Sequence, residues 1–364
     1  MAPTSGDQAV PNTSIHAAVA SLRGVVNAWN VRRNQIPSAD ERRELHTGVG
    51  GPDQPRLAVW RVWSPAGKND VYFGARGVGT QGRKGMTNER TSNPMLWATI
   101  AIAILLAASA VVGLVRPATY AKATLYTSAG AMGSDLVDLF VVVPVLLISG
   151  IKGYRGSVAA RLVWLGAQGY LLYNFVLYAF GVHFNVMSLV YWATLSLCLW
   201  ATIFSLPFIP LEQIAQAYGP RAPRKTTAIL LLVMTALFAA VDLGEDIPAL
   251  LAGRTPQSVT QVNLPVSFIH ALDLMFLLPG MCVTAYLLLR RKPSGYALAP
   301  AFLALLAIMN MELAVLMVVM ALKGVFGMSY PMIISFVVFG AGFAILLWMY
   351  FRSAGRAAWA VAAK

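Results

Sequence analysis

Eight long apolar runs constrain this chain more than any other feature of its sequence. Each run holds about 20 residues, and a helix that rises about 1.5 Å per residue crosses the hydrocarbon core of a bilayer over that length. The runs lie near 96–115, 135–151, 160–181, 186–208, 226–244, 265–289, 297–322 and 329–351. Hydrophobic residues make up 57% of the chain and charged residues 12%, with a mean hydropathy of +0.63, which excludes an ordinary soluble domain. The sequence therefore predicts an all-α, polytopic membrane bundle of eight transmembrane helices.

The distribution of lysine and arginine predicts the orientation of these helices. If the N-terminus lies inside, the basic clusters near 83–90, 152–161, 221–225, 290–292 and 352–364 all fall on the cytoplasmic side. The opposite side carries Arg116, Lys122, Arg254 and Lys323. Cytoplasmic loops of membrane proteins are rich in Lys and Arg, so both termini are expected in the cytoplasm. The net charge of +13 then reflects topology and contact with lipid, and we expect the lipid bilayer rather than nucleic acid as partner.

Residues 1–95 are a different kind of sequence from the rest. They are rich in Gly, Pro, Asn and Arg and poor in apolar residues, which predicts a polar, mostly disordered cytoplasmic segment. Within it, the stretch RLAVWRVWSPAGKNDVYFGAR alternates on both sides of a turn signal and predicts a β-hairpin. Everything that the membrane part needs follows Met86, which is therefore a candidate for the natural start.

The membrane part is interpreted as two copies of one four-helix unit, residues 96–208 and residues 226–352. The stretches DLVDLFVVVPV and HALDLMFLLPG align Asp135 with His270, Asp138 with Asp273, and Pro144 with Pro279. Two units with an even number of helices insert in the same orientation, which predicts parallel repeats related by an axis along the membrane normal. The alternative is a chance likeness between apolar helices that share proline and aspartate.

Two stretches of the membrane part resemble a known kind of protein. They are LVWLGAQGYLLYNFVLYAFGVHFN, and DLMFLLPG followed by LLLRRKPSGYALAP. With them, much of residues 96–350 is similar to a family of uncharacterised bacterial multi-pass membrane proteins. The resemblance implies a place in the bacterial plasma (inner) membrane and implies no activity.

Acidic residues inside the predicted spans are the first functional candidates, because an ionised acid at the centre of a bilayer costs roughly 2.5–3.5 kcal/mol. Asp138, Asp273 and Glu312 qualify. Glu312 is expected roughly 15–20 Å from either end of its helix, near the midplane. Asn310 lies two residues before it, on a different side of the helix. A charge at that depth has to be neutralised, paired or exposed to a water-filled cavity.

Other polar side chains accompany these acids in the sequence. Asp135 and His270 each stand three residues before an aspartate, and the His270–Asp273 spacing fits either a private hydrogen-bonded pair or a site that solvent reaches. In the third span Tyr170, Asn174 and Tyr178 recur every four residues and so share one helical face, with Tyr173 beside them. The acids Asp242, Glu245 and Asp246 are expected at the outer end of the fifth span.

Together these features predict a transporter that couples a proton or a cation to the movement of a small polar solute. Duplicated helical units, helices broken by proline beside carboxyl groups, and an acid near the midplane are typical of alternating access. In this hypothesis Glu312 carries the proton, while Asp138 and Asp273 form outer sites.

Two other functions stay open at this point. One is an intramembrane enzyme at the outer leaflet that uses His270, Asp273 and His183 as an acid/base or metal site. The sequence has no H-E-x-x-H or comparable ligand spacing, so we expect no metal, no cofactor and no catalytic residue, and an enzyme is the less favoured reading. The other is a membrane scaffold or sensor that acts through partners.

Overall fold

The computed structural model describes residues 94–218, 221–325 and 329–353. Within these ranges every regular element is a helix, as the all-α prediction requires. The expected hairpin and the candidate start at Met86 lie outside the described residues.

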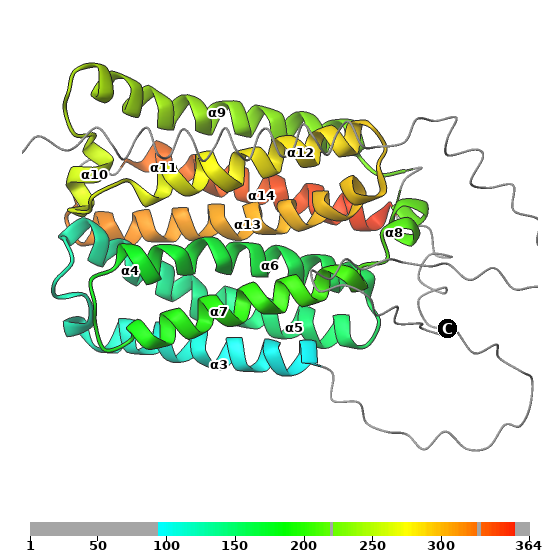
Figure 1. Cartoon of the computed structure of the whole chain (residues 1–364), viewed down its shortest axis with the longest axis horizontal. Coiled ribbons are helices and arrows are strands. Elements are labelled where there is room, and N and C mark those ends of the chain that lie inside the picture. The colour runs from blue at the N-terminus through cyan, green and yellow to red at the C-terminus, as the bar shows by residue number, and fades with distance from the viewer. Residues whose placement is uncertain (1–93, 219–220, 326–328, 354–364) are drawn as a thin grey trace, which may run out of the picture. The chain divides into compact units, whose positions relative to one another are not determined.

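The helices run side by side along one direction, and α3 begins at the end of the bundle where α14 finishes (Figure 1). The α-helices are α3 (Pro94–Val115), α4 (Leu125–Val137), α5 (Val143–Tyr154), α6 (Val158–Val176), α7 (Ser188–Ser205), α8 (Leu211–Tyr218), α9 (Arg224–Leu251), α10 (Gln257–Val262), α11 (Phe268–Leu272), α12 (Leu278–Leu289), α13 (Pro293–Leu322) and α14 (Tyr330–Arg352). Two 3₁₀-helices, η1 (Pro117–Tyr120) and η4 (Leu206–Phe208), and three π-helices, η2 (Asp138–Val142), η3 (Leu177–Gly181) and η5 (Asp273–Leu277), connect or interrupt them.

Among the described residues, 7 helical segments are long and apolar enough to cross a membrane, which indicates an integral membrane protein. They are Met95–Val115, Leu125–Tyr154, Ser188–Phe208, Arg224–Leu251, Phe268–Leu289, Pro293–Leu322 and Tyr330–Arg352. The eight-span expectation is not confirmed, because α6 is missing from this set. The physical reason lies in its composition, because Arg161, Gln168 and Asn174 lower the mean hydropathy of α6. Gln168 and Asn174 are buried inside the bundle.

Two segments contain the same interruption. In each, an aspartate begins a π-helical turn and a proline stands at the start of the α-helix that follows, with Asp138 before Pro144 and Asp273 before Pro279. Proline has no N–H to donate and its ring crowds the preceding turn, and a widened turn is one way in which a helix accommodates it. The local correspondence that the sequence predicted between these two stretches is therefore present.

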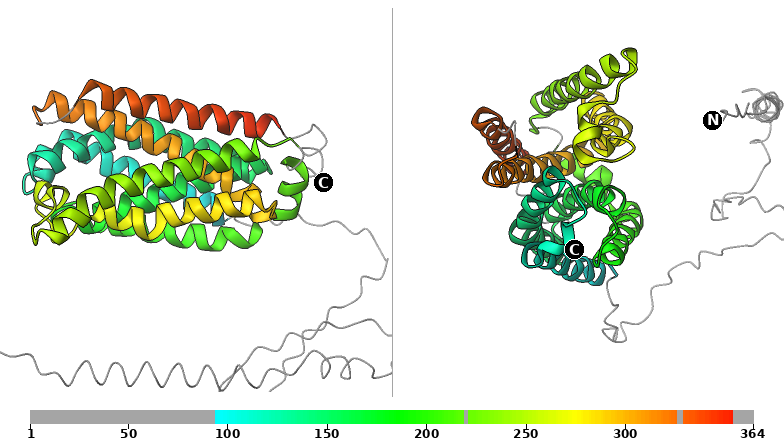
Figure 2. Two further views of the ribbon diagram at one scale, coloured as in Figure 1. Left: turned by 90° about the horizontal axis from the view of Figure 1, so that it is seen from above. Right: turned by 90° about the vertical axis from the view of Figure 1, so that its left-hand side faces the viewer.

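The packing around the two predicted units differs. Helices α3, α5, α6 and α7 form a ring in which each contacts the next, whereas α9 packs on α12, α12 on α13, and α13 on α14 (Figure 2). Helix α13 also packs on α4 and α6 of the first unit. The two parallel repeats are therefore not confirmed as an architecture and stay a prediction beyond the local match.

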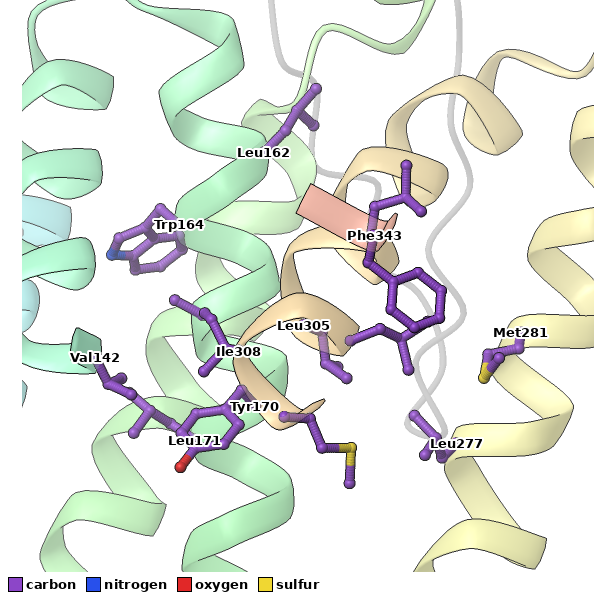
Figure 3. Packing of buried hydrophobic residues seen from close by; sticks show 14 of the residues in the cluster. Val142, Leu162, Trp164, Tyr170, Leu171, Leu277, Met281, Leu305, Ile308 and Phe343 are labelled. Carbon is purple, nitrogen blue, oxygen red and sulfur yellow. The ribbon is translucent and has the colours of Figure 1, made fainter. Parts of the chain in front are cut away.

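Helix α13 lies at the centre of the bundle because small residues let its neighbours approach closely. A side chain at Gly133 of α4 would overlap the backbone of Leu316, and one at Gly166 of α6 would overlap the carbonyl oxygen of Ala301. Close backbone approach at small residues is how helices associate in lipid, where there is little hydrophobic drive. Buried side chains of α6 and α13 fill the space between these helices (Figure 3). This packing brings Glu312 of α13 to the acids of α4.

Candidate functional site

Three carboxyl groups meet inside the bundle without a basic partner. Asp135 of α4, Asp138 of η2 and Glu312 of α13 are exposed to 2%, 1% and 8%. Among the described residues no lysine or arginine is buried, and the ion pairs present all involve His270. A partnerless charge in the membrane interior is costly, so each of these acids needs a proton or a bound cation to become neutral. We call Asp135, Asp138, Glu312 and their hydroxyl and amide partners the carboxyl network.

Asp135 is held by two tyrosines from different parts of the chain. The hydroxyl of Tyr120 in η1 donates to Oδ2 at 2.7 Å, and that of Tyr178 in η3 lies 3.0 Å from Oδ1. The Tyr178 hydroxyl also lies 3.1 Å from the carbonyl oxygen of Ala131. A hydroxyl has one hydrogen but accepts as well, so this arrangement serves Asp135 in both protonation states. The ionised acid accepts from Tyr178; the protonated acid donates to Tyr178, which then donates to Ala131.

Asp138 is bonded to the polar face of α6 that the sequence predicted. The Tyr170 hydroxyl donates to Oδ1 at 2.9 Å, and Asn174 Nδ2 donates to Oδ2 at 3.2 Å. The second hydrogen of the Asn174 amide reaches the Tyr170 oxygen at 3.1 Å. Tyr170 also interacts with the Glu312 carboxyl group, as does the hydroxyl of Ser134. Tyr170 therefore stands between two carboxyl groups with a single hydrogen to offer.

The connection after α3 completes the site. Burial, together with the neighbouring Asp135 carboxyl, raises the pKa of Tyr120 well above its usual value, so Tyr120 stays a hydrogen-bond donor at physiological pH. Gly113 of α3 makes the room for this contact. A Cβ atom there would overlap the Asp135 carboxyl group and would stand 2.7 Å from the Tyr120 hydroxyl. An alanine at this position is therefore incompatible with the observed placement of Asp135.

A second polar site surrounds His270. Its Nδ1 lies 3.1 Å from Oδ1 of Asp246, a hydrogen bond that the ring nitrogen donates to the carboxylate. Its Nε2 lies 3.7 Å from Asp242 and 3.9 Å from Glu245. These acids belong to α9, and Glu245 also accepts a hydrogen bond of 2.7 Å from the backbone of Ser258. The histidine is thus bonded to α9, and the private pair with Asp273, one of the two alternatives that the sequence left open, is not among its hydrogen bonds in the described residues.

The remaining predicted residues lie outside the carboxyl network. Asp273 is 8% exposed and interacts with the Tyr173 hydroxyl, while its Oδ1 has no hydrogen-bond partner within the described ranges. Asn310 donates to the carbonyl of Leu306 at 2.8 Å and faces Gly340 of α14, away from Glu312.

Several partners of the acids were not among the predicted residues. Tyr120 lies in the connection between two spans, and its sequence surroundings carry no sign that it bonds to Asp135. Ser134 and Gly113 are small residues of a kind found throughout membrane helices. The helical spacing from Asp138 puts Ser134 on the same face one turn earlier, which is the only available signal.

Within the part of the chain that the structure describes, no group of three or more His, Cys, Asp or Glu side chains could hold a metal ion. Cys198 and Cys282 are both free.

In comparisons with known proteins, no family model, no curated protein and no solved structure matches this chain.

Proposed function

We propose that this integral membrane protein is a transporter that couples the movement of protons to that of a small polar solute. The observation that carries the proposal is the carboxyl network, in which buried acids have hydroxyl partners and, among the residues that the structure describes, no basic partner. A buried acid with a purely structural role is usually paired or permanently satisfied in one state. Asp135 has hydrogen-bond partners for both of its protonation states, as a group that gains and loses a proton requires.

The geometry supports a proton path from Asp138 to Glu312. When Asp138 is protonated and Glu312 is ionised, Asp138 gives its proton to the Tyr170 oxygen while the Tyr170 hydrogen passes to Glu312. The reverse sequence returns the proton. Asn174 holds Tyr170 in place during either transfer because its amide donates to the hydroxyl oxygen in both states. The transfer leaves the number of ionised carboxyl groups unchanged, since Asp138 loses a proton as Glu312 gains one.

The sites occupy one end of the bundle, which we assign to the outer side of a bacterial plasma membrane. Helices α4 and α11, from which the acid-bearing segments start, begin at the end opposite to the one where α3 begins and α14 finishes (Figure 1). Basic residues concentrate near the latter end, and that asymmetry supports cytoplasmic termini. A start of α3 and an end of α14 on the same side require an even number of crossings between them, which supports α6 as an eighth crossing that its neighbours shield from lipid.

Infrared spectroscopy tests the proton path without knowledge of the solute. Protonated carboxyl groups absorb separately from ionised ones, so a pH titration of the protein in lipid nanodiscs should show the network gaining protons. We expect Glu312→Gln and Asp138→Asn each to remove a component of this signal. Glu212→Gln, a matched change at an exposed carboxyl group of α8 outside the candidate spans, should leave the components that depend on Glu312 and Asp138 unchanged.

Transport is tested in proteoliposomes that contain a pH indicator. A mixture of small polar solutes added outside should drive proton entry, and Glu312→Gln should slow it by about tenfold or more, the effect of about 1.4 kcal/mol added to a barrier. Proton entry no faster than in empty liposomes for every solute would contradict transport. Dependence on sodium instead of on the pH gradient would show that the network binds a cation in place of a proton.

A further inference from the structure

A small pocket opens where the α3–α4 connection meets the loop between η3 and α7. Its volume is about 200 Å³, and the residues that line it include Arg116, Thr119, Tyr120, Lys122 and His183. The loop is held in shape by Asn185, which accepts a hydrogen bond of 2.7 Å from the backbone of Met187 and donates one of 3.1 Å to the carbonyl of His183. The pocket is therefore built from the α3–α4 connection on one side and from a hydrogen-bonded loop on the other.

The charged side chains that line this pocket are all basic. Arg116 and Lys122 contribute positive charge, His183 adds an imidazole ring, and no aspartate or glutamate lines the pocket. Within the described ranges neither Arg116 nor Lys122 forms an ion pair. Apolar side chains such as Phe184 and Val182 complete the lining. Unpaired basic groups beside apolar walls favour a small anion that has an apolar part.

One buried hydroxyl in the pocket has no partner. Thr119 is 5% exposed, and its Oγ1 forms no hydrogen bond with any described residue. Leaving a buried hydroxyl unbonded costs free energy, and a bound acceptor removes that cost. Thr119 is followed by Tyr120, which lines the same pocket and donates to Asp135 at 2.7 Å. An anion held here would thus lie beside Tyr120, which is itself a member of the carboxyl network.

We propose that this pocket binds a small anion, such as an organic carboxylate, through Arg116, Lys122 and Thr119, and that the anion is the solute whose movement the proton path drives. The second half of this statement rests on the proposed function. A negatively charged solute and a proton then enter together without net charge, and Tyr120 is the contact between the two sites.

Binding is measured by titration calorimetry on the protein in nanodiscs of zwitterionic lipid, with acetate, benzoate and inorganic phosphate as probes at low salt. We expect binding of at least one probe by the wild type. Arg116→Gln combined with Lys122→Gln should weaken it by about tenfold or more, which corresponds to about 1.4 kcal/mol or more of binding free energy. Thr119→Val should weaken it while preserving both charges. Lys323→Gln, an exposed lysine that does not line the pocket, should leave affinity within twofold.

The outcomes separate this inference from the proposed function. Absence of binding, or equal binding by the double variant and Lys323→Gln, overturns the inference, whereas the infrared test of Glu312 and Asp138 needs no solute and stands or fails independently. An anionic lipid headgroup is the competing source of the same chemistry. If nanodiscs with phosphatidylglycerol abolish probe binding, and native mass spectrometry finds this lipid bound to the wild type but not to the double variant, the pocket holds lipid and the solute proposal is wrong.

Discussion

Replacing Gly113 by alanine tests whether the Asp135 carboxyl group lies against α3. The new Cβ atom would overlap this carboxyl group, so Asp135 has to move away from Tyr120 and Tyr178. Loss of two hydrogen bonds costs about 0.5–1.5 kcal/mol each. Crowding in a packed interior adds about 1–3 kcal/mol. The higher helix propensity of alanine returns about 0.8–1.0 kcal/mol. The expected loss in the free energy of unfolding is therefore about 1–5 kcal/mol.

A matched glycine-to-alanine substitution should raise the free energy of unfolding instead of lowering it. Gly342 of α14 also lies in a predicted span, but nothing lies within 4 Å of the position that its Cβ would take. Gly342→Ala should therefore gain up to about 1 kcal/mol from helix propensity alone. Thermal unfolding of both variants in one detergent measures the difference, at about 2–4 °C per kcal/mol.

The double variant makes the test specific. In the Asp135→Ala background the carboxyl group is gone, so Gly113→Ala should cost less than it does in the wild type, because substitutions in contact are not additive. If Gly113→Ala is as stable as Gly342→Ala, the Asp135 carboxyl group does not lie at α3 and the carboxyl network is wrongly assembled. The contact is confirmed if Gly113→Ala lowers the free energy of unfolding in the wild type but leaves it unchanged in the Asp135→Ala background.

Three other predictions concern the relay, the histidine site and the topology. Tyr170→Phe should slow proton transport by about tenfold or more, whereas Tyr286→Phe, at an exposed tyrosine of α12, should not; equal rates would exclude the relay. His270→Gln should destabilise the protein by about 1–3 kcal/mol because the α9 acids lose their partner. The loss should be smaller when those acids are neutralised, and an unchanged melting temperature would refute the role of His270. Reporter fusions after residue 255 should lie outside and those after residue 215 inside, and the reverse pattern would refute the basic-residue argument.

The sequence by itself determined the membrane character and part of the site. Long apolar runs admit few structures other than helices in lipid, because every backbone polar group has to be satisfied within its own segment. The helical period placed Tyr170, Asn174 and Tyr178 on one face, and the structure shows that this face meets Asp135 and Asp138. Regular spacing within one helix needs no knowledge of its neighbours, which is why this part was predictable.

The tertiary structure decided which acids meet. His270 stands one turn from Asp273 in the sequence but bonds to α9, because α9 packs against the helical segment that carries it. Glu312 reaches Asp138 because α13 packs on α4 and α6, where Gly133 and Gly166 allow close approach. Contacts between helices depend on small residues, hydrogen bonds and shape, and these leave no periodic signal in a chain that is apolar throughout.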